Sequence, residues 1–421
     1  MKNALLIAAA LLLLGACEGK FAVGNGNGPE LLTPTSESPE SDPSGPQLVE
    51  PVTEQPTETE STPPETIGPE VVYDVPEFTG AQILEYMRSI SQLLVSRPLT
   101  SAEADTVVAG GVDAIEPMLR AWAGEPAFAD NARYLMQQKL KASGERDGID
   151  FELPGNLVAH VVKNDLPWST ILTADYCVDR AGEQAPCDSG APFVAGVLST
   201  RAYLAGNASR FNLGRANRMM NVFACRIYPM EAELQPYLDK TQLIPMFQAN
   251  SAEEQTVAEA QGGFGNGSGC YTCHGQFGAH AQLFVKFDES GMYQPEATGQ
   301  QDPAGELGRS VDGLMTSHFN DAARAADERS QLFGREVTNL ADAARILASS
   351  EPFLPCQARG ILQHTFGLGE SADLATEMLQ AIASRAQEIS TDPTFADIVV
   401  ATFTEPRVIL SVVGAVEGGT P

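Results

Sequence analysis

The chain has 421 residues, with 55 acidic and 26 basic side chains and a formal net charge of −29. This excess of carboxylates argues against nucleic acid as a partner, because binding to a polyanion needs a basic surface. The length is sufficient for one large domain or two ordinary ones.

The N-terminus has the pattern of an export signal. A single lysine precedes a short apolar run at residues 4–14, which ends in the sequence LGAC at residues 14–17. This ending resembles the lipobox of bacterial lipoproteins, and it implies that a signal peptide, residues 1–16, is removed and that Cys17 carries lipid. An ordinary signal peptide with an incidental cysteine is the alternative. Because Glu18 replaces the aspartate of an inner-membrane retention signal, we expect a lipid anchor in the outer membrane, on its periplasmic face or at the cell surface.

Residues 17–75 are interpreted as the lipidated cysteine followed by a disordered linker. Residues 18–75 are rich in Pro, Thr, Ser and Gly and contain 12 acidic residues but only one lysine. Such a segment cannot bury enough apolar surface to offset the entropy that ordering would cost. We therefore expect an extended tether between the membrane and the folded part of the chain.

The folded part, from residue 76 onward, has the pattern of a mainly α-helical protein. In residues 78–97 apolar side chains recur at helical spacing, and Thr79 is the expected N-cap. Pro98 ends this helix, and Thr100 or Ser101 caps the next one. Further helical stretches are expected at residues 112–124, 126–144, 311–319, 337–350, 352–369, 371–389 and 393–403.

A glycine-rich stretch at residues 262–269 suggests a domain boundary. It would separate an N-terminal helical domain, residues 76–262, from a C-terminal helical domain, residues 263–421, that contains the motif described below.

The seven cysteines suggest a disulfide framework, because export places the chain in an oxidising environment where free thiols are uncommon. Cys177 and Cys187 bracket a polar loop, so a local bridge between them is the simplest pairing. Cys225 and Cys356 would then join two distant helical segments. The alternative for either of these two is a buried free thiol, since cysteine packs as a small apolar residue.

The remaining pair belongs to the sequence CYTCH at residues 270–274. In c-type cytochromes such a CxxCH motif attaches haem through both sulfurs, and the adjacent histidine binds the iron. Cys270 and Cys273 would thus hold haem c covalently, with His274 as the proximal ligand.

Two other chemistries compete for this motif. A zinc site could use both cysteines and His280, but structural zinc sites usually have a second pair of ligands at short spacing. A disulfide or redox-active CxxC is the second alternative. The redox-active form would require a strand before a helix, whereas a glycine-rich segment precedes the motif.

Residues 270–294 resemble the CxxCH…FExFDxxGxYR segment of planctomycete and myxobacterial cytochrome-c-like surface proteins of unknown function. Residues 97–107, 196–229 and 340–369 are similar to other parts of these proteins, in the same order. The resemblance implies a covalent haem and a surface location, without a defined reaction. The chain departs from the family pattern just after the motif, where QFGA replaces residues like DPLG, so the local fold around the haem can differ.

The sequence offers two candidates for a second iron ligand, and a five-coordinate haem without one is the alternative. Met315 lies at the spacing at which small cytochromes often place a methionine ligand, and His318 lies close behind it. His280, only six residues after His274, is expected to face away. Each candidate also has a structural interpretation, as core methionine or as structural histidine. Met219 and Met220 are expected to be packing residues. His160 and His364 lie in apolar helical stretches and are expected to be core histidines with satisfied hydrogen bonds.

The leading functional hypothesis is a monohaem c-type cytochrome for electron transfer, with an unknown redox protein as partner. Arg215, Arg218 and Arg226 are candidates to pair with haem propionates, or else ordinary surface arginines. A haem-dependent peroxidase-like enzyme is a second hypothesis, with His318 as its distal acid–base group. A surface lipoprotein that only binds a partner, with the CxxC as a zinc clip or disulfide, is the third.

Overall fold

The computed structural model describes residues 77–146, 148–228, 242–244, 268–305, 308–369 and 372–417. The expected signal peptide, lipidated Cys17 and linker lie outside these residues, and so does the expected boundary at residues 262–263. All described residues belong to one compact unit that begins at Glu77.

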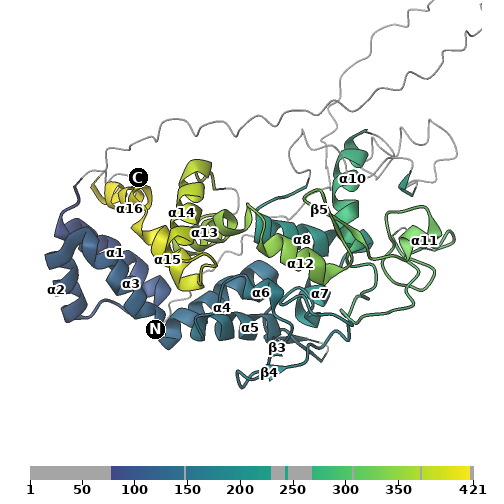
Figure 1. The fold of residues 1–421 in the computed structure, drawn as a ribbon, viewed down its shortest axis with the longest axis horizontal. Helices are drawn as coiled ribbons and strands as arrows, with labels where there is room; N and C mark the ends of the chain where they lie inside the picture. Colours follow the sequence, from purple (N-terminus) through teal and green to yellow (C-terminus); the bar gives the residue numbers. More distant parts are fainter. Residues whose placement is uncertain are drawn as a thin grey trace, which may run out of the picture. The chain divides into compact units, whose positions relative to one another are not determined.

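This unit is mainly helical, as the sequence predicts, and its few strands form short two-stranded sheets (Figure 1). Helices α4 and α5 pack side by side, and the β1–β2 pair connects them. The elements before the motif are α1 (Gly80–Leu94), α2 (Ser101–Gly110), the 3₁₀ turn η1 (Gly111–Ala114), α3 (Ile115–Ala123), α4 (Pro126–Leu140), β1 (Glu145–Arg146), β2 (Ile149–Asp150), α5 (Leu153–Lys163), α6 (Thr170–Thr173), β3 (Cys177–Val178), β4 (Gln184–Ala185), α7 (Arg201–Gly206), the 3₁₀ turn η2 (Arg210–Asn212) and α8 (Leu213–Ala224).

The first two helices begin at the threonines that the sequence indicates. The Thr79 side chain accepts a hydrogen bond from the backbone N–H of Gln82, whose own side chain accepts one from the backbone N–H of Thr79. Thr100 and Glu103 form the same reciprocal capping box at the start of α2, so Thr100 and not Ser101 is the cap. Each box satisfies backbone donors that the helix itself leaves unpaired.

The second half of the unit begins with the helix that carries the CxxCH motif. Its elements are α10 (Ser268–Gln282), α11 (Ala322–Ala325), β5 (Ser330–Leu332), β6 (Arg335–Val337), α12 (Leu340–Ala348), α13 (Phe353–Thr365), α14 (Thr376–Ile389), α15 (Phe395–Thr404) and α16 (Pro406–Glu417).

The helix expected at residues 311–319 is not there, and this prediction was wrong. Gly313 has a φ of +78°, and the backbones of Arg309 and Met315 pair as an isolated bridge. The Asp312 carboxylate accepts hydrogen bonds from Ser310 and from the backbone of Leu314. A short acidic side chain followed by glycine favours this turn over a helix, because it offers the backbone local partners.

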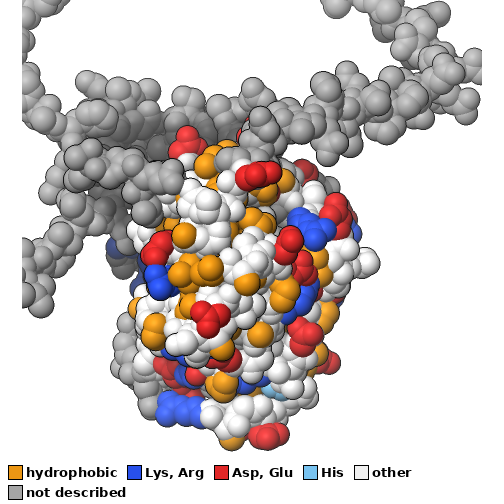
Figure 2. All heavy atoms as spheres, turned by 90° about the vertical axis from the view of Figure 1, so that its left-hand side faces the viewer, with side chains coloured by type: hydrophobic (Ala, Val, Ile, Leu, Met, Phe, Trp, Pro, Cys, Tyr) orange, Lys and Arg blue, Asp and Glu red, His pale blue; other side chains and the backbone are white. Residues whose placement is uncertain are grey.

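The outer surface at the α1–α2 side shows acidic and basic side chains interspersed with apolar ones (Figure 2). Val108 on α2 is 50% exposed and Leu410 on α16 is 45% exposed. Single exposed apolar residues of this kind are normal on the surface of a folded protein. Among the described residues, no helix has the length and apolar character needed to cross a bilayer.

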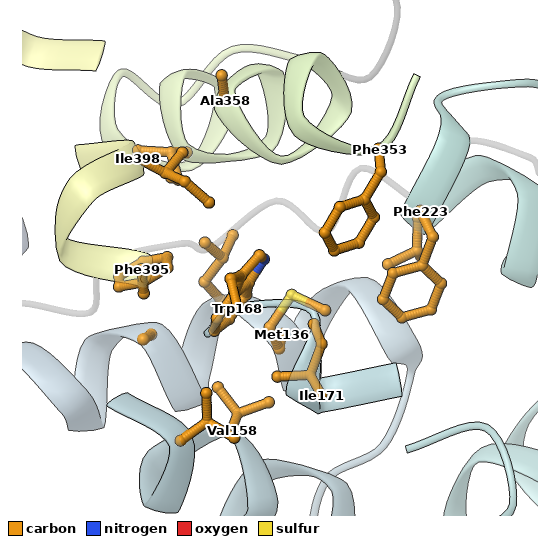
Figure 3. Close-up of a cluster of buried hydrophobic side chains, with 14 of the residues drawn as sticks. Met136, Val158, Trp168, Ile171, Phe223, Phe353, Ala358, Phe395 and Ile398 are labelled. Carbon is orange, nitrogen blue, oxygen red and sulfur yellow. The ribbon is translucent and has the colours of Figure 1, made fainter. Parts of the chain in front are cut away.

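Most of the interior of the unit is one large apolar cluster (Figure 3), beside a small one of Leu243, Ala279 and Phe319. Trp168 lies near the centre of the large cluster, with its ring centroid 4.7 Å from that of Phe395 on α15. Phe223 of α8 and Phe353 of α13 belong to the same cluster, and so does Phe277 of α10. Described segments from before and after residues 262–263 therefore share a single core.

Both predicted disulfides are confirmed. Cys177 and Cys187 close the loop that contains the β3–β4 pair, and their Cα atoms lie 5.0 Å apart. Cys225, directly after α8, is bonded to Cys356 on α13 across a sequence separation of 131 residues. The second bridge thus covalently joins helices from the two halves of the chain.

Candidate haem-binding site

Helix α10 carries the complete CxxCH motif. Cys270, Cys273 and His274 occupy positions that are three and four residues apart, and such positions share one face of an α-helix. The side chains of the two cysteines lie outside the described part of the structure. The helix contains three glycines, which have low helix propensity, so its stability must come from packing. Phe277 and Ala281, on the same face as His274, supply that packing in the main core.

The structure brings His274 together with His318. Nδ1 of His274 lies 3.3 Å from Nε2 of His318, and the two ring centroids are 5.4 Å apart at an interplanar angle of 46°. Only 3% of His274 and none of His318 is exposed. Two imidazoles that are 44 residues apart in sequence therefore meet inside the protein.

Aromatic rings enclose this histidine pair. The Phe277 ring centroid lies 4.4 Å from that of His274 and 4.8 Å from that of His318. The Phe211 centroid lies 5.0 Å from that of His318. Such surroundings keep water away from both imidazoles.

Phe211 reaches this position through an unusual backbone. Both Phe211 and Asn212 adopt the left-handed region, with φ of +58° and +56°. Each such residue costs about 1–3 kcal/mol when it is not glycine. Arg215 stabilises the turn, because its Nη1 donates to Oδ1 of Asn212 at 2.9 Å. The backbone is thus in an unfavourable conformation at Phe211, the residue whose ring lies beside the histidine pair.

Burial keeps both histidines of the pair neutral at pH 7. Desolvation lowers the pKa of His274 to about 4, and it lowers the pKa of His318 well below its ordinary value. Neutral imidazole is the form that binds a metal. The donor set therefore fits a haem iron, which takes imidazole ligands.

His318 has one buried nitrogen with no hydrogen-bond partner in the structure, Nδ1. A buried polar atom without a partner costs about 1–3 kcal/mol. The pair is thus a costly arrangement for a purely structural contact.

Helix α10 fixes the segment around His318 through its last residue. Nε2 of Gln282 donates to the backbone carbonyls of Arg324 and Ala325, each at 3.1 Å, and Oε1 of Gln282 accepts from the hydroxyl of Ser317 at 2.6 Å. Gln282 is 1% exposed. One buried amide therefore connects the motif helix to the chain on both sides of His318.

His280 belongs to a different contact. Its Nδ1 lies 2.5 Å from the hydroxyl of Tyr228, and its side chain is fully buried. Burial, together with the positive charge of Arg226, lowers the pKa of His280 to about 3. This places His280 beside Tyr228 and not in the pair.

Among the described residues, no group of three or more His, Cys, Asp or Glu side chains could hold a metal ion.

Met315 is 2% exposed and lies in the turn that replaced the expected helix. The residue that lies against His274 is His318, three positions later.

Met219 and Met220 are fully buried in the core on α8, which confirms their packing role. His160 and His364 were expected in the core, but both are only half-buried, so that expectation was wrong.

Arg215 has a structural role in this fold, because it is completely buried. Its guanidinium donates to the backbone carbonyls of Leu204 and Phe287, each at 2.8 Å, and also to that of Asp288. Burial lowers its pKa to about 10. The described contacts thus commit Arg215 to main-chain carbonyls and away from the surface role that the sequence suggested. Arg218 donates to the carbonyl of Lys139 at 3.1 Å.

Three contributors to the site escaped prediction, Phe211, Phe277 and Gln282, and so did Tyr228, the partner of His280. Phe277 and Gln282 could have been suspected, because they follow the motif on the same helix at helical spacing. Phe211 and Tyr228 lie far from the motif in sequence, and no local pattern marks them.

The resemblance seen in the sequence has no independent support: no protein-family model, characterised protein or solved structure matches this chain.

Proposed function

We propose that this protein is an exported, lipid-anchored monohaem c-type cytochrome that transfers electrons. Haem c would be attached through Cys270 and Cys273, and His274 would bind the iron. A redox protein of the cell envelope would be its partner, and the acidic segment after Cys17 would hold the cytochrome away from the membrane.

The state of the cysteines is the observation that carries this proposal. Four of the seven cysteines are consumed in two disulfides. Apart from Cys17, this leaves only Cys270 and Cys273, which share a face of α10 with the buried His274. Two spare cysteines that precede an inward-facing neutral histidine at this spacing are what covalent haem attachment requires.

The surrounding residues have definable roles toward such a cofactor. The haem would supply one-electron chemistry. His274 would present a neutral nitrogen to the iron, while Phe277 and Phe211 exclude water and lower the local dielectric. Gln282 would hold the facing segment at a fixed distance from α10. Burial and ligand type are the features by which a protein sets a haem potential.

Covalent haem is tested by a pyridine haemochrome spectrum of protein that has been matured with a cytochrome c assembly system. We expect one haem with two thioether bonds per chain. The double variant Cys270→Ser/Cys273→Ser should lose it. Cys177→Ser/Cys187→Ser, which also removes two cysteines, should retain it. A wild-type protein without covalent haem would overturn the proposal and favour the zinc or disulfide alternatives.

Electron transfer is separated from a peroxidase-like activity by turnover with hydrogen peroxide. A carrier should exchange electrons with a small soluble redox dye and show negligible peroxide turnover. Sustained peroxide turnover by the haem-loaded protein would favour the enzyme instead.

The lipid anchor has its own test. Cys17→Ala should shift the protein from the membrane fraction to the soluble fraction and abolish incorporation of labelled fatty acid. Retention of both properties would show that Cys17 is not the lipid site.

A further inference from the structure

We infer that His318 is the second protein ligand of the haem iron, so that His274 and His318 together would hold it. This inference rests on the proposed function, because an iron is needed to make the pair a ligand set. It goes beyond it by deciding between Met315 and His318 and by naming the kind of haem site.

The contact between the two rings carries the inference. Nε2 of His318 is directed at the ring of His274 from 3.3 Å, and both side chains are buried. Two ligands of one iron must come from separate parts of the fold and converge on a common point. His274 comes from a helix and His318 from a segment without regular structure 44 residues later, as this requires.

The segment that carries His318 is fixed on both sides of that residue. The backbone N–H of Ser317 donates to the carbonyl of Gly299 at 2.8 Å, and the carbonyl of His318 accepts from the backbone N–H of Ile244 at 2.8 Å. The Ser317 hydroxyl is bonded to Gln282 on α10. His318 is therefore held against the motif helix by its neighbours, which is the preorganisation that a ligand needs.

The burial of His318 is costly for a structural residue. Its Nδ1 is buried without a hydrogen bond in the structure, although nearly all buried polar atoms find a partner. A histidine buried only for packing would be replaced at lower cost by an apolar residue. Ligation through Nε2 would give the imidazole a function there, while Nδ1 would stay unpaired.

Met315 is the competing ligand, and its position argues against it. It lies in the turn formed around Gly313, with its backbone paired to Arg309, three residues before His318. Bringing Met315 to His274 would displace His318 from its present contact. A site with two histidines leaves no open iron position for peroxide, and its potential should be lower than that of a His/Met site.

The wild-type spectrum provides the first test. Haem-loaded protein should show the low-spin electron paramagnetic resonance signal and the near-infrared band of an iron with two imidazole ligands. A methionine-to-iron band, or a five-coordinate high-spin spectrum, would overturn the inference. Either result leaves the proposed function intact as long as the pyridine haemochrome still reports covalent haem.

Two matched variants identify the ligand residue. His318→Ala and Met315→Ala each remove one buried side chain, three positions apart. His318→Ala should become high-spin, should bind carbon monoxide when reduced, and should recover its low-spin spectrum when free imidazole is added. Met315→Ala should keep the wild-type spectrum. The opposite pattern would assign Met315 and overturn the inference.

A third variant covers the case in which His318→Ala fails to mature. His318→Met keeps a long ligating side chain, and we expect it to convert the two-histidine spectrum to that of a His/Met site with a raised potential. An unchanged two-histidine spectrum in this variant would show that another histidine binds the iron. His280→Phe should leave the spectrum unchanged, because His280 is engaged with Tyr228.

Discussion

Two regions of this protein are held together in different ways. The helical body, residues 77–228 and 340–417, consists of helices that pack apolar faces into one core. The motif region, the described residues of 268–338, has one substantial helix and long connections without regular structure. Buried polar side chains occur in both regions, but relative to the number of residues they are more frequent in the motif region. There they are His274, Gln276, His280, Gln282, Ser310, Thr316, Ser317, His318 and Ser330.

This difference shows how a fold can hold a site in place. Apolar packing tolerates changes of shape at constant volume, so it fixes positions loosely. A buried amide such as that of Gln282 bonds to named carbonyls and fixes the distance between two segments. The motif region uses such buried hydrogen bonds around His274 and His318. Its stability should therefore depend on individual polar contacts more than that of the helical body does.

The largest effect should come from the long-range disulfide of the helical body. Replacing Cys225 and Cys356 by serine should lower the free energy of unfolding by about 5 kcal/mol, because the bridge closes a loop of 131 residues. The matched change at Cys177 and Cys187 should cost about 3 kcal/mol for its shorter loop. Urea denaturation of both double variants measures the two losses in the free energy of unfolding. Equal losses would contradict the loop-entropy explanation.

The next largest loss of stability should follow from removing apolar packing in the core. Trp168→Ala should destabilise the protein by about 4 kcal/mol, because it empties the centre of the core. Trp168 is 1% exposed, and its indole N–H is bonded to Gln357 at 3.2 Å. The haem spectrum of the folded variant should be unchanged, since the motif region does not depend on this contact. Tyr134→Ala, at a side chain that is 53% exposed, serves as the control and should change stability by less than about 0.5 kcal/mol.

A smaller effect should come from the polar link between the two regions. Arg215 lies on α8 and bonds to the carbonyl of Phe287 in the motif region. Arg215→Lys keeps the charge but cannot reach all its acceptors, so we expect a loss of about 3 kcal/mol. Hydrogen exchange should increase around residues 283–294 more than in α4. Uniform exchange throughout the molecule would mean that Arg215 supports the whole fold and not this link.

The smallest effect is a pH dependence. Burial raises the pKa of Glu328 to about 6, above its ordinary 4.5. The folded chain then binds more protons than the unfolded chain between these values, so this residue makes stability fall as pH rises through that window. Glu328→Gln should therefore be more stable than wild type above pH 6 and equal to it near pH 4. A constant difference in melting temperature across this range would refute the assignment.

Much of the helical body could be predicted because its determinants are local. Thr79 and Thr100 mark helix starts through partners three residues away. The disulfides followed from export, from the polar loop between Cys177 and Cys187, and from the two cysteines then left over. The motif region was harder. Residues 311–319 have a helical apolar pattern, yet the turn at Asp312 and Gly313 overrides it through side-chain hydrogen bonds.

By itself, the sequence determined the helical class, the caps, the disulfide pairs and the CxxCH spacing, because each depends on residues close together in the chain or on a small set of cysteines. It favoured Met315 as the second ligand by its spacing, with His318 close behind. Only the tertiary structure placed His318 against His274, Tyr228 against His280, and Phe211 over the pair. These contacts join segments that are 44 residues or more apart, and such contacts depend on how whole elements pack.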